Sequence, residues 1–157
     1  MKIQLPVVQK AKQWKRRNKK ALGKLRGLAN LDNEILSTHE RVFSEVDCLE
    51  CANCCKTTGP LFTQKDIQRI SKHLGIKAGR FIQKYLLMDE DGDFILQVLP
   101  CPFLAENNAC NIYNSRPKAC REYPHTYQKG QSKIFSLTMK NMEICPAVFE
   151  IFKRVVK

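Results

Sequence analysis

Cysteines are the residues in this sequence best suited to do chemistry, and four of them stand in the stretch CLECANCCK at positions 48–56. The whole chain holds eight cysteines in 157 residues. A thiolate sulfur can bind a metal ion, attack an electrophile or form a disulfide with a second sulfur. The choice among these three reactions largely decides what the protein does.

The cysteines follow the pattern C-x2-C-x2-C-C with four more at larger distances. The set is Cys48, Cys51, Cys54, Cys55, Cys101, Cys110, Cys120 and Cys145. Three cysteines at successive x2 intervals are typical of the run that supplies three corners of an iron–sulfur cube. Structural zinc sites more often have two separated pairs. The pattern therefore predicts metal coordination by these eight residues, with zinc or an iron–sulfur cluster as the cofactor and a 4Fe-4S cluster slightly favoured by the spacing.

Cys54 and Cys55 are adjacent, which constrains how they can be used. Neighbouring side chains point to opposite faces of an extended chain, or about 100° apart on a helix. We therefore expect these two to serve two centres, or one of them to bridge. Eight ligands at four per site also give two sites. We expect Cys48, Cys51 and Cys54 to share one centre, and the sequence leaves the division of the distant cysteines open.

Three other interpretations of the cysteines carry less weight. Inert buried cysteines are common, but four within eight residues are not expected by chance. A catalytic nucleophile needs one activated cysteine rather than eight. Disulfides need an oxidising compartment, whereas the first twenty residues show no apolar stretch typical of a secretory signal. We expect a cytoplasmic protein with reduced thiols and no transmembrane segment.

Cations stand beside several of the cysteines. Arg116 and Arg121 flank Cys120, and Lys56 follows Cys55. Such cations offset thiolate charge and can raise the potential of a redox centre. The alternative is that each is solvated on a helix surface.

Four motifs in order resemble those of one family: "CLECANCC", "LFTQKDIQRISKHLGI", "CPFL" and "CNIYNSRPKACREYP". They resemble the YkgJ-type cysteine-cluster proteins, also called the CxxCxxCC family, over about residues 48–125, and Cys145-Pro146 also fits. The resemblance implies a zinc- or iron-chelating domain, in some members an iron–sulfur protein, in which all eight cysteines are candidate ligands. It implies no settled activity.

An enzymatic role is an alternative that the same resemblance raises. Related cysteine clusters occur in flagellin lysine methylases, which are larger proteins. This sequence shows no Gly-rich cofactor loop. A cluster-dependent modifying enzyme of the lysine-methylase kind therefore remains an alternative, and we lean against an enzyme.

Positive charge is concentrated at the N-terminus. The net charge is +12, and residues 1–29 hold ten Lys or Arg and no acid. Apolar residues recur at helical spacing from Val7 to Leu28, with the basic residues on the opposite face. The segment predicts salt-sensitive binding of nucleic acid through residues 1–29, so that a zinc-stabilised nucleic-acid-binding module is a second alternative function.

Other roles for this segment stay open. The helix could lie on an anionic membrane, or its charges could form a solvated face. An unknown protein partner is a further alternative. Trp14 and Leu25 could equally pack onto the rest of the chain.

The remaining pattern predicts a mainly α fold with a small β component (α+β), a compact helical domain organised around the cysteine sites. We expect a basic N-terminal helix in residues 1–30 and a cysteine-cluster domain in residues 31–157. The cysteine cluster is expected in a loop. The expected helices are 7–28, 32–46, 63–75, 77–88, a short helix opened by Ser115-Arg116-Pro117 and a closing helix from Pro146. The capping box TQKD opens the helix at 63–75, and Gly75 ends it. Strands are expected at 94–99 and 135–139.

Overall fold

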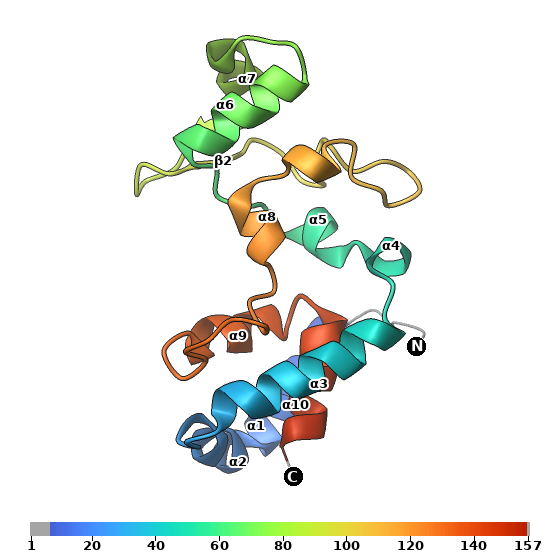
Figure 1. Cartoon of the computed structure of the whole chain (residues 1–157), viewed down its shortest axis with the longest axis vertical. Coiled ribbons are helices and arrows are strands. Elements are labelled where there is room, and N and C mark those ends of the chain that lie inside the picture. The colour runs from blue at the N-terminus through green and yellow to red at the C-terminus, as the bar shows by residue number, and fades with distance from the viewer. Residues whose placement is uncertain (1–6, 157) are drawn as a thin grey trace. The chain divides into compact units, whose positions relative to one another are not determined.

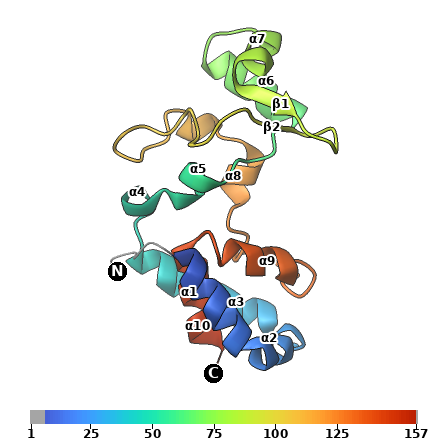
Figure 2. The same ribbon diagram turned by 180° about the vertical axis from the view of Figure 1, so that it is seen from behind.

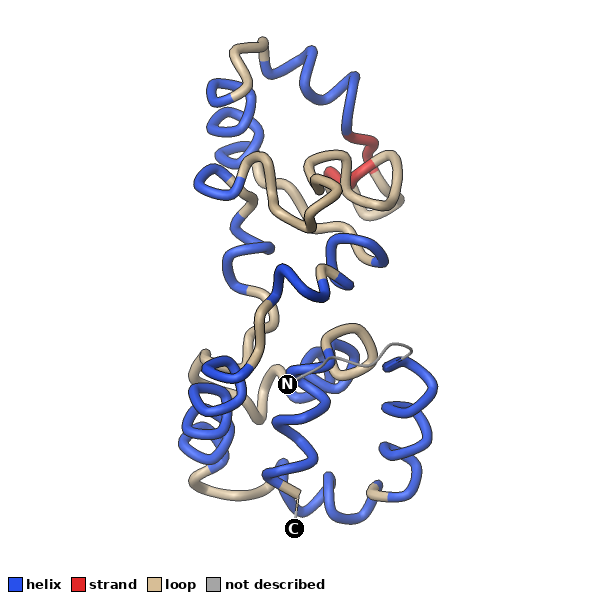
Figure 3. The backbone as a smooth tube through the Cα atoms, turned by 90° about the vertical axis from the view of Figure 1, so that its right-hand side faces the viewer, coloured by secondary structure: helices blue, strands red, loops and turns tan. Residues whose placement is uncertain are grey.

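The computed structural model describes residues 7–156, and the side chain of Val7 lies outside the described part. The chain divides into two compact units: unit 1 is residues 1–48 with 124–157, and unit 2 is residues 49–123. Helices dominate both, and the strands form one short hairpin in unit 2 (Figure 3). The mainly α fold with a small β component is thus confirmed, while the boundary expected at residue 30 stays a prediction.

Unit 1 is built from helices packed around one apolar core. Its helices are α1 (Val7–Arg17), α2 (Lys19–Arg26), α3 (Leu31–Glu45), α9 (Phe135–Asn141) and α10 (Pro146–Val155). The long helices α3 and α10 lie side by side (Figure 1), and α1 packs on α10 (Figure 2). The buried residues of α3 are Leu31, Ile35, Thr38 and Val42, a helical spacing that presses one face of α3 onto Val148 and Phe152 of α10.

Two expectations for unit 1 were wrong in detail. The single helix expected at 7–28 is interrupted at Asn18, whose side-chain amide and backbone N–H both donate to the carbonyl of Trp14. The strand expected at 135–139 is the helix α9. Its inward residues are Phe135, Thr138 and Asn141, and the two polar ones hid the helical period in the sequence.

Asp32 ties the start of α3 to the turn that precedes α9. Its two carboxylate oxygens accept hydrogen bonds from the backbone N–H groups of Gly130 (2.7 Å) and Gln131 (2.8 Å). Gly130 adopts φ +79°, a backbone conformation that suits glycine. The hydrogen bond from Gly130, and next that from Gln131, lowers the pKa of Asp32 below its ordinary value.

Unit 2 combines short helices with a hairpin. Its elements are α4 (Cys48–Cys51, whose first residue belongs to unit 1), α5 (Asn53–Thr57), α6 (Gln64–His73), α7 (Ala78–Tyr85), β1 (Leu86–Met88), β2 (Phe94–Leu96), the 3-10 helix η1 (Tyr113–Ser115) and α8 (Lys118–Glu122). The strands β1 and β2 pair antiparallel, with Leu86 opposite Leu96. Ile67 and Ile70 of α6 pack with Phe81 of α7 and Phe103 to form the core.

Local sequence signals predicted most of the helix and strand positions in this unit. The capping box of Thr63 and Asp66 opens α6 as expected, and Gly75 follows its end with φ +67°. The helix expected at 77–88 ends at Tyr85, because residues 86–88 pair with β2. The expected strand is limited to three residues.

Two further boundaries in unit 2 differ from expectation. The helix expected to open at Ser115 begins at Lys118. The cysteine segment, expected as a loop, forms the two short helices α4 and α5. Among the helices of the described residues, none is long and apolar enough to cross a membrane.

We predict that Asp32→Asn lowers the free energy of unfolding by about 1 kcal/mol at neutral pH, because the charge that accepts two backbone N–H groups is lost. The pKa of Asp32 is lower in the folded chain than in the unfolded one. Its contribution is therefore complete above about pH 4 and is lost as the pH falls through the folded-state value. Urea unfolding at pH 7 and at acidic pH measures the difference.

The matched control is Glu34→Gln, in the same helix, where the carboxylate accepts from the exposed side chain of Asn30. This variant should unfold like the unaltered chain at both pH values. An Asp32→Asn chain as stable as the control would contradict the role of the carboxylate.

Candidate metal centre

Four cysteines of unit 2 lie on separate segments within electrostatic range of one another. Cys55 lies on α5 and Cys120 on α8, while Cys101 and Cys110 lie in the irregular segment between β2 and η1. The charge of Cys55 raises the pKa of each of the other three, and the charges of Cys101 and Cys110 also raise the pKa of Cys120. We call Cys55, Cys101, Cys110 and Cys120 the sulfur quartet.

Backbone hydrogen bonds bring the quartet's segments together. The N–H of Cys101 donates to the carbonyl of Cys55 at 2.8 Å, which joins α5 to the following segment. Leu104 forms an antiparallel bridge with Cys110, and the N–H of Asn111 donates to the carbonyl of Phe103. Cys101 and Cys110 therefore stand on the two arms of one small folded loop.

The same loop carries backbone N–H groups that favour the ionised form of two of the thiols. Burial raises the pKa of Cys101 and of Cys110, and nearby N–H groups oppose it: those of Phe103 and Leu104 at Cys101, and that of Ile112 at Cys110. In both cases the donor lies two or three residues after the cysteine. Such donors stabilise the thiolate form, which is the form that binds metal.

Burial and mutual repulsion oppose ionisation of these thiols. Burial, followed by the charges of Cys55, Cys101 and Cys110, raises the pKa of Cys120 to about 12. Burial is also the main cause of the raised pKa of Cys101 and of Cys110. For Cys55 the first cause of the raised pKa is its hydrogen bond with Cys54. The quartet is therefore protonated at neutral pH unless a cation compensates four thiolates.

Cys54 lies next to the quartet. Its sulfur is 4.0 Å from that of Cys55, closer than the orientation of adjacent side chains suggests. A zinc–sulfur bond of about 2.3 Å implies about 3.8 Å between two sulfurs of a tetrahedral site. This pair thus has nearly the separation of two ligands of one ion. As the described side chains stand, no group of three or more His, Cys, Asp or Glu residues is arranged to hold a metal ion.

The remaining cysteines are not assigned to the quartet. Cys48 is exposed at the start of α4, and Cys51 is buried at its end. Cys145 belongs to unit 1, where it immediately precedes α10 and its N–H donates to the carbonyl of Asn141. That Cys48, Cys51 and Cys54 share a centre stays a prediction, as does a ligand role for Cys145.

A buried carboxylate that the sequence analysis assigned only to a helix cap also positions the quartet. Asp66 is 1% exposed. Besides capping α6, it accepts from the backbone N–H of Lys118 (3.0 Å), two residues before Cys120. Arg69 donates both to Asp66 (2.6 Å) and to the carbonyl of Arg116 (2.9 Å). The start of α8 is therefore fixed to the start of α6.

The hydrogen bonds keep Asp66 charged despite its burial. Burial by itself would raise the pKa of Asp66, but hydrogen bonds from Arg69, Thr63 and Lys118 outweigh it, so that the pKa is lowered. The capping box was visible in the sequence. The contact with Lys118 had no local signal, because the two residues are 52 positions apart.

Half-buried thiols on several segments within electrostatic range of one another are typical of a cysteine-rich metal-binding protein. The CxxCxxCC family, described as "Putative zinc- or iron-chelating domain", matches residues 47–146. The chain belongs to this family, as the sequence motifs indicated. No solved structure matches the chain.

We predict that Asp66→Asn destabilises unit 2 by about 2–3 kcal/mol, because an amide cannot accept all the buried donors that the carboxylate accepts. Release of the Lys118 N–H should also increase its hydrogen-exchange rate. Thermal unfolding and hydrogen exchange of the Lys118 amide measure both effects. Glu106→Gln, on an exposed residue of the same unit, is the control and should change neither quantity.

Proposed function

We propose that the sulfur quartet binds a metal centre through the thiolates of Cys55, Cys101, Cys110 and Cys120. The observation that carries the proposal is the convergence of four cysteines from separate segments into mutual electrostatic range. Bringing these groups together has a cost that a bound cation removes, since Cys55, Cys101 and Cys110 raise the pKa of neighbouring thiols. Membership of a zinc- or iron-chelating family supports the same conclusion.

The finer proposal is an iron–sulfur cluster with a role in electron transfer. The C-x2-C-x2-C run of Cys48, Cys51 and Cys54 lies outside the quartet, but it is typical of iron–sulfur proteins and so supports a cluster over zinc in this chain. The backbone N–H groups of Phe103, Leu104 and Ile112, which lower the pKa of Cys101 and Cys110 against burial, support a redox role, because N–H groups near sulfur raise the potential of a cluster. The cluster would supply one-electron exchange, and the chain would set its potential.

Arg116 contributes charge at the same place. Its guanidinium stacks on the ring of Tyr113 at 3.7 Å and donates to the Tyr113 carbonyl, which fixes its position. Its charge lowers the pKa of Cys110 and of Cys120, in opposition to burial. The hypothesis that Arg116 offsets thiolate charge is favoured by this placement. Lys56 donates to the backbone carbonyl of Cys51, and its charge also lowers the pKa of Cys55, in opposition to the hydrogen bond with Cys54 and to burial.

We predict that protein purified without oxygen is brown, contains iron and acid-labile sulfide, and bleaches when dithionite reduces it. Cys120→Ser should lose the iron of the quartet, because one of four ligands is removed. Ser71→Ala, which removes a buried hydroxyl from α6 of the same unit, is the control and should keep its iron. Elemental analysis and the visible spectrum measure the result.

Two results separate the parts of this proposal. A colourless protein with stoichiometric zinc that Cys120→Ser loses would leave the quartet as a metal site and remove the iron–sulfur and redox proposal. Metal content unchanged by Cys120→Ser would contradict the quartet itself.

We predict that metal binding releases protons, because the quartet thiols have raised pKa values and must ionise to become ligands. Zinc added to the reduced, chelator-treated chain in weak buffer at pH 7 should release about four protons per ion bound at the quartet. The apparent affinity should fall as the pH is lowered. Release of fewer than about one proton would show that the thiols are not the ligands.

A further inference from the structure

Most of the net positive charge of this protein lies in unit 1, which does not contain the quartet. Unit 1 has 17 Lys or Arg against 7 Asp or Glu, a net charge of +10. Unit 2 has 10 against 8, a net charge of +2. Compensation of thiolates in the quartet therefore does not account for the basic residues of unit 1.

Six of these cations are exposed on two consecutive helices. We call this set the basic face: Arg16, Arg17, Lys19, Lys20, Lys24 and Arg26 of α1 and α2, with the intervening turn. Within the described residues, none of the six makes an ion pair. Their positive charge is therefore available to a partner.

Four of the seven acids of unit 1 are engaged elsewhere. Glu143 pairs with Lys15 at 2.6 Å and with Lys12 at 4.0 Å. Glu45 and Glu150 both pair with Arg154. Asp32 accepts backbone N–H groups, as described above. An anion at the basic face therefore has no internal ion pair to displace.

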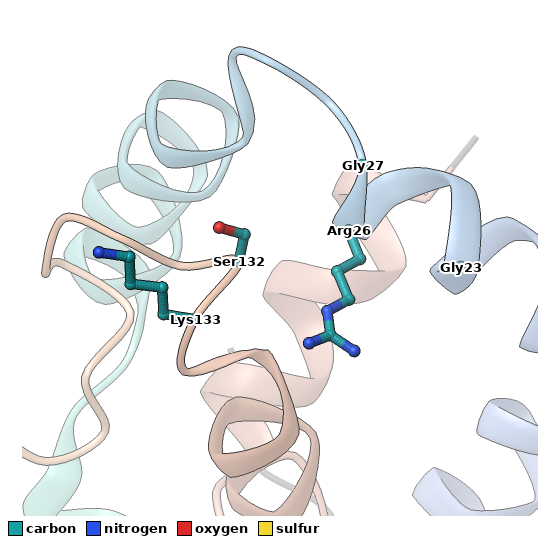
Figure 4. Close-up of a pocket in the computed structure, with 5 residues that line it drawn as sticks. All are labelled: Gly23, Arg26, Gly27, Ser132 and Lys133. Atoms are coloured by element: carbon teal, nitrogen blue, oxygen red, sulfur yellow. The ribbon is translucent and has the colours of Figure 1, made fainter.

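The basic face continues into a shallow, open depression beside the end of α2. It is lined by Gly23, Arg26, Gly27, Ser132 and Lys133. Figure 4 shows Arg26 on one side and Ser132 with Lys133 on the other. A side chain at Gly23 would meet nothing within 4 Å, so this wall is open to a ligand. The ammonium of Lys133 is directed away from Arg26 (Figure 4), so the depression adds exposed positive charge to the basic face and is not a convergent phosphate site.

The apolar side of the same helices is already used. Ala11, Leu22 and Leu25 are buried in the core of unit 1. Trp14 meets the ring of Phe149 edge-on, with 5.8 Å between centroids. A helix that lies on a membrane must bury its apolar face among the lipids. The packing of this face against the chain disfavours that alternative and leaves a surface that acts by charge.

We infer that the basic face, with the depression between Arg26 and Lys133, binds the phosphate backbone of nucleic acid without reading its sequence. Lys and Arg that neutralise phosphates release condensed counterions, and this drives association at low salt. The contacts are to phosphate, so binding is independent of base sequence. The surface lies in unit 1, and the inference does not depend on the metal centre.

The test uses the full chain in reducing buffer and a fluorescein-labelled duplex DNA of arbitrary sequence. Fluorescence anisotropy over a series of salt concentrations gives the dissociation constant and its salt dependence. The variant Arg16→Gln/Lys20→Gln/Lys24→Gln should weaken binding at least about tenfold near 0.1 M salt and lower the slope of log K against log salt by about 3. Arg26→Gln/Lys133→Gln should lower the slope by about 2.

The control removes the same charge from unit 2. Lys65→Gln/Lys72→Gln/Lys77→Gln alters three exposed lysines and should bind the duplex like the unaltered chain. If circular dichroism shows that the triple variant of the basic face has lost helix, the single variant Lys20→Gln replaces it, with an expected slope change of about 1.

Three results would overturn the inference. The first is a basic-face variant that binds within about twofold of the unaltered chain, since removed phosphate contacts must lower affinity. The second is an equal loss in the unit 2 control, which would show a response to net charge alone. The third is co-sedimentation of the chain with vesicles containing anionic phospholipid, combined with no binding to the duplex, which would assign the basic face to membranes.

Discussion

Thiolates repel one another, and a half-buried site that gathers four of them needs a cation to stabilise their ionised form. The sulfur quartet of unit 2 has this property. Burial and neighbouring sulfurs raise the pKa of its thiols, as is most pronounced at Cys55 and Cys120. The N–H groups of Phe103, Leu104 and Ile112 act in the opposite direction and favour the thiolate. A site with both features is prepared for a ligand that replaces protons.

The rest of unit 2 positions the cysteines and the backbone N–H groups near them. The bond from Cys101 to the carbonyl of Cys55 fixes α5 to the loop that carries the next two cysteines. Asp66 and Arg69 fix the start of α8, which carries Cys120, to α6. The core around Phe81 and Phe103 includes buried residues of α6 and of the loop, and so packs the two against each other. Polar contacts thus define where the sulfurs lie, while apolar packing stabilises the elements that carry them.

Unit 1 has a different physical character. Its core is apolar, and its surface carries most of the net charge of the chain. The helices α1 and α2 use Leu22 and Leu25 for packing and leave Lys20 and Lys24 in solvent. The same amphipathic pattern therefore stabilises the unit and presents the basic face. The sulfur quartet and most of the net charge therefore belong to separate units of one chain.

Local sequence signals determined much of the fold. The capping box of Thr63 and Asp66, the glycine at 75 and the apolar spacing of α3 and α10 act within one or two turns of chain, so they could be identified without a structure. The strand expected at 135–139 was wrong because Thr138 and Asn141 are polar residues with buried partners, which a pattern of apolar residues cannot show.

The sequence by itself determined that cysteines are the chemical groups of this protein and that the chain belongs to a metal-chelating family. Only the tertiary structure decided which cysteines meet. Sequence spacing groups Cys48, Cys51 and Cys54, whereas the folded chain brings Cys55 to Cys101, Cys110 and Cys120. The physical reason is that ligand spacing is a local property, while convergence depends on hydrogen bonds between distant segments, such as Lys118 to Asp66 and Cys101 to Cys55.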